Sequence, residues 1–169
     1  MTKRAFFSAI AVCGLGMVLG AGCASEDPSA LNPVNPEGIP GDSPLPPRGE
    51  LGELVPSHPL QSQPIYFDYD SALIKDSEMS KIQAAAKYLI ENSALKCQLE
   101  GNCDERGSAE YNMSLGERRA QAVRANLIRF GLDSSKLYTK SYGEEKPVDA
   151  GHDESAWRKN RRVEFALYK

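Results

Sequence analysis

Apolar residues between Ala109 and Phe130 recur at helical spacing and define one face of a long predicted helix. They are Leu115, Ala122, Val123, Leu127 and Phe130. At about 100° per residue, Arg119 projects close to the middle of this apolar face. A guanidinium directed toward a core must be paired or must reach a cleft, because burial without a partner is too unfavourable. The sequence offers a partner upstream in Asp104, which ends an apolar, strand-like run.

The rest of the pattern predicts four strands and a second helix. Alternation of apolar and polar residues predicts strands at 65–69, 95–103, 136–142 and 161–168. A helix is expected over 76–92, and the long helix should end at Gly131. The order strand, helix, strand, helix, strand, strand favours an α+β sandwich, with the helices packed on one face of a small mixed sheet.

Two local features refine these predictions. Asp76 or Ser77 is the expected N-cap of the helix over 76–92. The side chains expected to face inward from this helix are Met79, Ile82, Ala86, Leu89 and Ile90. The segment 143–159 is expected to be a long loop with one helical turn near 155–158.

The first 22 residues have the pattern of a secretory signal, because Lys3 and Arg4 precede an apolar stretch and small residues precede Cys23. The apolar stretch is shorter than the roughly 20 residues that a membrane span needs. The run Gly20-Ala21-Gly22-Cys23 resembles the lipobox of bacterial lipoproteins, in which the cysteine is lipidated and becomes the mature N-terminus. An ordinary signal peptide with a chance cysteine is the alternative.

Ten of the eleven prolines lie between Pro28 and Pro64, mixed with Gly, Ser, Asn and Asp. This composition predicts a disordered, Pro-rich tether over 23–57, followed by one folded domain over 58–169. Removal of Lys3 and Arg4 with the signal leaves 18 basic against 23 acidic residues, a net charge of about −5. Such a balance argues against a nucleic-acid partner.

Cysteine and histidine usage gives no sign of a cofactor or metal. Cys97 and Cys103 would lie roughly 20 Å apart on one extended strand, beyond disulfide reach, so we interpret both as small buried hydrophobic residues. His58 and His152 have no metal-ligand neighbours at useful spacing.

Spaced sequence blocks occur in one order along 64–169 and resemble the OmpA-like peptidoglycan-binding domain, and more closely the peptidoglycan-associated lipoprotein family. The blocks are Tyr66-Phe67-Asp68-Tyr69-Asp70, Glu100-Gly101-Asn102-Cys103-Asp104-Glu105-Arg106-Gly107, Glu110-Tyr111-Asn112, Ser114-Leu115-Gly116-Glu117-Arg118-Arg119-Ala120, Ser141-Tyr142-Gly143-Glu144-Glu145-Lys146-Pro147, Gly151-His152-Asp153-Glu154 and Asn160-Arg161-Arg162-Val163. Asn102 and Cys103 replace the His and Ala often found there, so no contact of that His is carried over.

The resemblance implies binding, without covalent chemistry, to the diaminopimelate residue of the peptidoglycan stem peptide. This residue exposes an ammonium and a carboxylate on one carbon. Asp104 would accept the ammonium, and Arg119 would hold the carboxylate with two parallel hydrogen bonds. The resemblance also places five residues around the pocket: Phe67, Asp68, Tyr111, Asn112 and Leu115. The backbone N–H groups of Tyr111 and Asn112, at the start of a helix, are expected to be free for an anion.

Each assignment has a structural alternative. Asp104 and Arg119 can form an ion pair that only supports the fold, and Asp68 can cap a turn. Phe67 and Leu115 are expected to serve partly as core and partly as pocket wall. Of the adjacent pair Arg161 and Arg162, one is expected to be solvated and the other paired. If Asp104 and Arg119 act only on the ligand, alanine at either position removes binding and leaves thermal unfolding almost unchanged.

The resemblance further implies a lipid-anchored protein on the periplasmic face of the outer membrane, which Ala24 rather than Asp after Cys23 also favours. It would join membrane to cell wall in a Tol-Pal type system for envelope integrity and cell division, with the periplasmic protein TolB as partner. A generic wall-tethering lipoprotein outside the Tol system is one alternative. A peptidoglycan hydrolase is another, but Asp104 and Glu105 would point to opposite faces of a strand, and nucleophile or zinc motifs are lacking.

Overall fold

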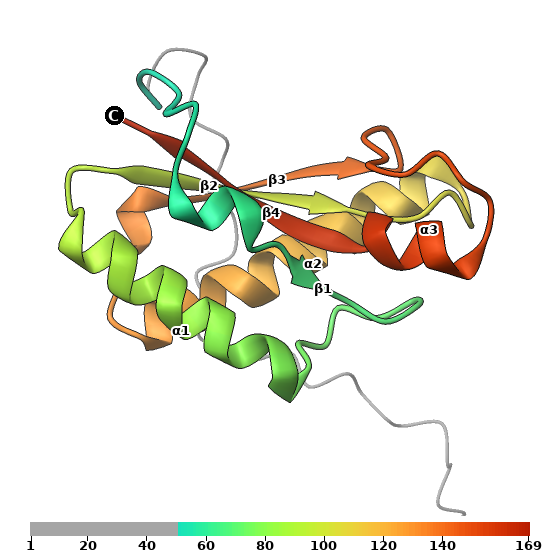
Figure 1. Ribbon diagram of the computed structural model, residues 1–169, viewed down its shortest axis with the longest axis horizontal. Helices are drawn as coiled ribbons and strands as arrows, with labels where there is room; N and C mark the ends of the chain where they lie inside the picture. Colours follow the sequence, from blue (N-terminus) through green and yellow to red (C-terminus); the bar gives the residue numbers. More distant parts are fainter. Residues whose placement is uncertain (1–50) are drawn as a thin grey trace, which may run out of the picture. The chain divides into compact units, whose positions relative to one another are not determined.

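The computed structural model describes residues 51–169 (Figure 1). The predicted signal, the lipidation site Cys23 and most of the predicted tether lie outside the described residues. The strands are β1 (Ile65–Tyr66), β2 (Lys96–Asn102), β3 (Leu137–Gly143) and β4 (Arg162–Tyr168). The helices are α1 (Asp76–Glu91), α2 (Ala109–Arg129) and α3 (Glu154–Asn160), with 3-10 turns η1 (Pro59–Ser62) and η2 (Ser134–Lys136). None of these helices is long and apolar enough to cross a membrane.

The strands form a mixed sheet in the order β1-β4-β2-β3. Strands β2 and β3 run parallel, whereas β4 is antiparallel to both β1 and β2. Helices α1 and α2 lie together on one face of this sheet (Figure 1). The predicted α+β architecture, with the helices on one face of a mixed sheet, is confirmed.

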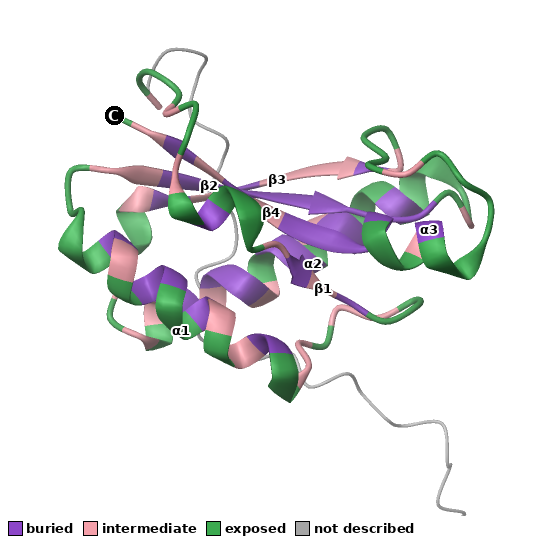
Figure 2. Cartoon of the chain, in the orientation of Figure 1, coloured by how far each residue is buried: buried purple, intermediate pink, exposed green. Residues whose placement is uncertain are grey.

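The core lies between that sheet face and the two helices, because alternate strand residues meet the apolar stripes of α1 and α2. Leu99 and Leu167 from the strands and Ile82 and Leu127 from the helices are buried in it. Figure 2 shows the buried residues concentrated along β2 and β4 and on the inner sides of the helices. Cys97 is a free, buried member of this core, as predicted.

Some local predictions were wrong. β1 ends at Tyr66 instead of continuing to residue 69, and the following segment turns at Asp70, which has a φ of 51°. The N-cap of α1 is Lys75, without a side-chain cap hydrogen bond. Ile90 is 51% exposed, while Ala85, which was not predicted to face inward, is buried. By contrast, Gly131 follows α2 with a φ of 97°, which fits a helix-ending glycine.

A short segment before η1 also joins the sheet. Glu53 and Lys169 exchange two backbone hydrogen bonds of 3.1 and 2.9 Å, and the Val55 N–H donates to the Leu167 carbonyl over 2.8 Å. Pairing with the C-terminal end of β4 therefore starts upstream of residue 58. The ordered contacts of this domain begin before the position at which its sequence pattern becomes strand-like.

Candidate functional site

A cavity of about 90 Å³ opens where the start of α2, the segment after β1 and the segment after β2 meet. Its lining combines acidic, basic, aromatic and apolar side chains. The lining residues are Tyr69, Asp70, Cys103, Asp104, Arg106, Gly107, Tyr111, Asn112, Leu115 and Arg119. Five of the seven ligand-binding residues predicted from the sequence therefore lie in the wall of one cavity, which we call the Asp104–Arg119 cavity.

Arg119 is completely buried, because α2 carries it on its core-facing side. Its Nε donates to the Ser71 carbonyl over 2.8 Å, and its Nη2 donates to the Asp68 carbonyl over 3.0 Å. Its Nη1 donates to the Asn102 carbonyl over 3.0 Å and to the Cys103 sulfur over 3.3 Å. These contacts use four of the five N–H donors of a guanidinium. Arg119 thus joins three backbone segments, and the two-bond fork expected for a ligand carboxylate is largely engaged already.

Burial lowers the pKa of Arg119, and the neighbouring Cys103 and Asp104 partly oppose that shift. Arginine remains charged in proteins even so. The ring centroid of Phe67 lies 5.3 Å from the guanidinium carbon, which adds a cation–π contact on one side. Arg119 therefore gives the cavity a fixed positive wall.

Asp104 is 4% exposed and is paired with two other arginines. Its Oδ1 accepts from the backbone N and the Nε of Arg106, over 3.1 and 3.2 Å. Its Oδ2 accepts from Arg106 Nη2 over 2.8 Å and from Arg161 Nη1 over 3.1 Å. Among the residues of the described domain, Asp104 makes no ion pair with Arg119. The partnership read from the sequence was wrong, although both side chains line the same cavity.

The pKa of Asp104 is affected in opposite directions. Burial raises it, but hydrogen bonds from Arg106 and Arg161 lower it more, and the pKa lies below the usual value for an aspartate. The carboxyl group is therefore an anion at neutral pH, in the wall of the cavity that Arg119 also lines.

Arg106 and Arg161 were not identified from the sequence as site residues. The Arg106 guanidinium carbon lies 4.0 Å from the ring centroids of both Tyr69 and Trp157, so the group is stacked between two aromatic rings. Arg161 is 3% exposed, and besides Asp104 it donates to the Phe67 carbonyl over 3.1 Å and to Glu154 over 2.6 Å.

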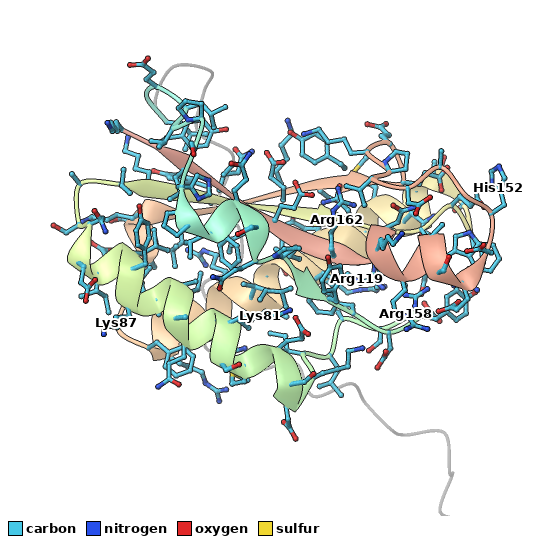
Figure 3. All side chains as sticks on the ribbon, in the orientation of Figure 1. Lys81, Lys87, Arg119, His152, Arg158 and Arg162 are labelled. Carbon is cyan, nitrogen blue, oxygen red and sulfur yellow. The ribbon has the colours of Figure 1, made fainter. Side chains whose placement is uncertain are left out.

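Arg161 and Arg162 are both buried and both paired, so the expectation that one would be solvated was wrong. Arg162 is 3% exposed and bonds to Glu164 over 2.5 Å. Figure 3 shows Arg162 and Arg119 near the middle of the domain, with His152 and Arg158 toward the end that carries α3.

Tyr111, Asn112 and Leu115 project from the first turns of α2. Leu115 forms an apolar part of the cavity wall, and the Tyr111 hydroxyl donates to the Asp70 carboxylate at the rim. The Asn112 amide is 2% exposed and fixes the loop before α2 through the Asp104 and Arg106 carbonyls, each over 3.2 Å. The same nitrogen contacts Glu144 over 2.6 Å, which ties that loop to the segment after β3.

The backbone N–H groups of Tyr111 and Asn112 are not free for an anion. Ser108 is the N-cap, its hydroxyl accepts from the Tyr111 N–H over 3.2 Å, and its carbonyl accepts from the Asn112 N–H over 2.9 Å. The expected anion contact at these two groups was therefore wrong, because the helix cap satisfies them.

Phe67 and Asp68 do not line the cavity. Phe67 is completely buried in the core and reaches the site only through its contact with Arg119. The Asp68 carboxylate pairs with Lys75 over 2.7 Å in solvent, whereas its carbonyl accepts from Arg119. Both residues contact Arg119, and neither presents a side chain to the cavity.

Within residues 51–169, no group of three or more His, Cys, Asp or Glu side chains is arranged to hold a metal ion. Cys103, like Cys97, is a free and buried thiol. The Cys103 sulfur donates to the Asn112 carbonyl over 3.3 Å and contacts Arg119, so it forms part of the cavity wall as a small packed side chain.

A mixed sheet covered by α1 and α2, with a cavity walled by Asp104 and Arg119, defines the class to which this chain belongs. A sequence model of the OmpA family matches residues 66–161, more than half of the chain, and the chain therefore belongs to the OmpA family.

Within that family, the chain is similar to peptidoglycan-associated lipoproteins. The protein of that name from Pseudomonas putida is 39% identical over 170 residues, which cover 94% of this chain and 96% of that protein. The one from Haemophilus influenzae is 49% identical over 102 residues, covering 60% of this chain and 67% of that protein. The similarity to the first of these includes nearly the full length of both proteins.

Solved structures agree with this relationship. The crystal structure of the peptidoglycan-associated lipoprotein from Burkholderia pseudomallei is 40% identical in sequence, with a TM-score of 0.61, over 62% of this chain and 89% of that one. The C-terminal domain of Helicobacter pylori MotB is 25% identical, with a TM-score of 0.59, over 63% of this chain and 84% of that one. The fold is thus shared by proteins of different names.

Proposed function

We propose that this chain is a non-enzymatic, lipid-anchored protein of the outer membrane that binds peptidoglycan through the diaminopimelate residue of the stem peptide. Membership of the OmpA family and similarity to peptidoglycan-associated lipoproteins support this function. The observation that carries it is that Asp104 and Arg119 line one cavity without neutralising each other directly. Such a cavity brings an anion and a cation from different segments to the two charges of one zwitterionic group.

The proposed ligand matches the cavity in size and charge. The volume of the cavity, about 90 Å³, exceeds the roughly 10–15 Å³ that a single water needs, so one amino-acid head group is a reasonable occupant. The ammonium would lie against Asp104, and the carboxylate would lie toward Arg119. Because Arg119 has one N–H left over from its backbone contacts, we expect a single hydrogen bond reinforced by charge in place of the two-bond fork.

The residues of this site do not favour hydrolysis. Hydrogen bonds from two arginines hold the pKa of Asp104 low despite its burial, which is the opposite of what a general acid needs. Glu105 bonds to His152 over 2.8 Å and to the Trp157 indole over 2.9 Å, and it is absent from the cavity lining. The other carboxylate of the cavity lining, Asp70, accepts a hydrogen bond from the Tyr111 hydroxyl. Asp104 therefore lacks the raised pKa that the general acid of a glycosidase needs.

Lipidation of Cys23 would anchor the chain, and the Pro-rich segment after it would let the domain reach the wall. We further propose a TolB-like periplasmic partner in a Tol-Pal type system, with a site that overlaps the cavity. Two aromatic side chains of the cavity lining are exposed, Tyr69 (58%) and Tyr111 (43%), and they would suit a protein partner. Co-purification of a TolB-type propeller would distinguish this role from that of a generic wall tether.

The binding function is tested by competition. Purified full-length protein in detergent is pulled down on isolated sacculi in the presence of the tripeptide L-Ala-γ-D-Glu-meso-diaminopimelate. The matched control is the same tripeptide with L-lysine, which keeps the side-chain ammonium but lacks the carboxylate on the same side-chain carbon. We expect the diaminopimelate tripeptide to release the protein and the lysine tripeptide to be a much weaker competitor. Equal competition by both peptides would contradict a role for Arg119 in ligand binding.

The anchoring is tested separately with Cys23→Ser. This variant should remain soluble in the periplasm, whereas the unchanged protein should fractionate with the outer membrane. Membrane fractionation of the serine variant would contradict lipidation at this position.

A further inference from the structure

Arg106 already fills the position that the proposed function gives to the ligand ammonium. Its side chain contacts both oxygens of Asp104, over 3.2 and 2.8 Å, in the bidentate geometry favoured by guanidinium and carboxylate. The Arg106 backbone N–H and Arg161 supply two more hydrogen bonds to the same carboxylate. A carboxylate accepts about four hydrogen bonds. An incoming ammonium therefore finds no free acceptor on Asp104 until a partner leaves.

Arg106 is the partner that can leave. The side chain of Arg161 is only 4% exposed and is also held by the Phe67 carbonyl and by Glu154. The side chain of Arg106 is 29% exposed, and its other contacts are the faces of two aromatic rings and the half-exposed carboxylate of Glu154. Rotation of Arg106 out of the cavity requires no opening of the core, whereas removal of Arg161 does.

A second carboxylate is in place to receive the displaced group. Glu154, in the first turn of α3, has an oxygen 3.7 Å from Arg106 Nη2 and is 52% exposed. Movement of Arg106 toward Glu154 would exchange a buried pairing for a more exposed one, while the ligand ammonium takes its place on Asp104. The number of positive groups around Asp104 is the same before and after this exchange.

We propose that Arg106 is a built-in competitor, which occupies the ammonium subsite in the free protein and is exchanged for the ligand ammonium on binding. This inference rests on the proposed peptidoglycan function. The exchange makes the site selective, because a simple amine only replaces one cation by another at Asp104. A ligand that also presents a carboxylate to Arg119 gains a contact that Arg106 cannot make. Diaminopimelate is thereby favoured over the many amines of the periplasm.

The exchange has an internal reporter. Trp157 is the only tryptophan in the sequence, and its ring is one of the two that stack on Arg106. Departure of the guanidinium from a centroid distance of 4.0 Å changes the surroundings of this single fluorophore. Binding of the diaminopimelate tripeptide should therefore alter the intrinsic tryptophan emission of the unmodified protein.

The experiment measures affinity by calorimetry and tryptophan emission by titration, in parallel, with full-length protein and the diaminopimelate tripeptide. Arg106→Gln should bind the tripeptide about 5-fold more tightly or better, the low end of typical coupling between competing equilibria, and should lose most of the emission change. Arg158→Gln, which removes an exposed arginine from α3 without touching the cavity, is the matched control and should behave like the unchanged protein.

Each outcome decides the matter. Calorimetric binding to the unchanged protein without any change in emission overturns the exchange and leaves the proposed function intact, whether or not Arg106→Gln folds. Equal or weaker binding by a folded Arg106→Gln also overturns it, because Arg106 then helps the ligand or ignores it. Absence of calorimetric binding to the unchanged protein contradicts the proposed function itself, and the exchange with it.

Discussion

Gly101 of β2 and Gly116 of α2 pack backbone against backbone, and a Cβ atom on Gly101 would lie only 1.9 Å from the Gly116 carbonyl oxygen. A Cβ on Gly116 would in turn lie 2.3 Å from the Ser141 hydroxyl of β3. This close approach sets α2 directly on β2 and β3, one turn before Arg119. It thereby fixes the depth at which the Arg119 guanidinium meets the end of β2.

Gly101→Ala should destabilise the fold, because the clash is with backbone that cannot move without shifting α2. Overpacking of this kind costs about 1–3 kcal/mol and at times more. The measurement is urea unfolding followed by circular dichroism. Gly131→Ala is the control, since its φ of 97° is unfavourable for alanine but no atom lies within 4 Å of its Cβ position. A smaller loss for Gly101→Ala than for Gly131→Ala would argue against the close packing of α2 on β2.

Arg119→Lys should destabilise the protein and weaken sacculus binding together. Lysine keeps the charge but lacks the planar fork that holds the carbonyls of Asp68, Ser71 and Asn102. Leaving a buried polar group unsatisfied costs about 1–3 kcal/mol. Arg118→Lys, at the adjacent exposed position, is the matched control and should change neither property. Unaltered unfolding of Arg119→Lys would show that the loop after β1 does not depend on the guanidinium.

Asp104→Ala should remove binding and also lower stability, contrary to the expectation from sequence that unfolding would hardly change. The variant leaves the buried Arg161 without one of its two carboxylate partners. Breaking a buried ion pair from one side costs about 3–5 kcal/mol, which corresponds to a fall in Tm of roughly 10 °C or more. A thermal melt within two degrees or so of the unchanged protein would contradict this pairing.

The same pair gives the fold an acid sensitivity with a definite sign. The pKa of Asp104 is lower in the folded state than in an unfolded chain, where it is about 3.9. Its stabilising contribution is therefore complete above about pH 4 and is lost as the pH falls through the folded-state pKa. Carboxylates titrate between about pH 5 and pH 2. Over this range, the free energy of unfolding of Asp104→Ala should consequently fall less than that of the unchanged protein.

The two histidines should titrate on opposite sides of the usual value. A hydrogen bond that His152 donates to the Glu105 carboxylate raises the pKa of His152, whereas burial lowers the pKa of His58. NMR titration of the imidazole protons should show one midpoint above and one below 6.5. The His152–Glu105 contact contributes below about pH 6.5 and weakens as the pH rises through the raised pKa. Glu105→Gln should lower only the upper midpoint; a shift in both would indicate a wider rearrangement.

The two described thiols should differ in reactivity. Burial raises the pKa of both, but the positive charge of Arg119 opposes this effect at Cys103, which lines the cavity. Iodoacetamide labelling of the native protein, mapped by mass spectrometry, should therefore modify Cys103 before Cys97. The diaminopimelate tripeptide should slow labelling of Cys103 and leave Cys97 unaffected. Equal rates would mean that both thiols react only after global unfolding.

Much of the fold could be predicted from periodicity alone. The 3.6-residue repeat of α2 and the alternation in β4 placed both elements within a residue of their observed bounds, because each repeatedly buries one face. The early end of β1 could not be predicted in this way. The apolar–polar alternation continues to Tyr69, and the turn at Asp70, which has a left-handed φ of 51°, comes only after the strand has ended.

The charges of the site were predicted, but not their partners. Asp104 and Arg161 are 57 residues apart and meet only because β2 and β4 pair in one particular antiparallel register, which the local sequence does not specify. One signal was available for Arg161. It lies two and four positions before Val163 and Phe165, which face the core, so it belongs to the same face of the strand. No comparable pattern indicates that Tyr69 and Trp157 would stack on Arg106.

The pairing of Glu53 and Val55 with β4 has a mechanical consequence. These residues join β4 at its C-terminal end, whereas Arg161 and the cavity lie at its N-terminal end. A pull between residue 51 and a wall fragment held in the cavity therefore runs lengthwise through the sheet. The backbone bonds between antiparallel strands stand perpendicular to that direction, so tension shears them collectively and does not unzip them one by one. Under such a pull, the domain would be loaded along the direction of its strands.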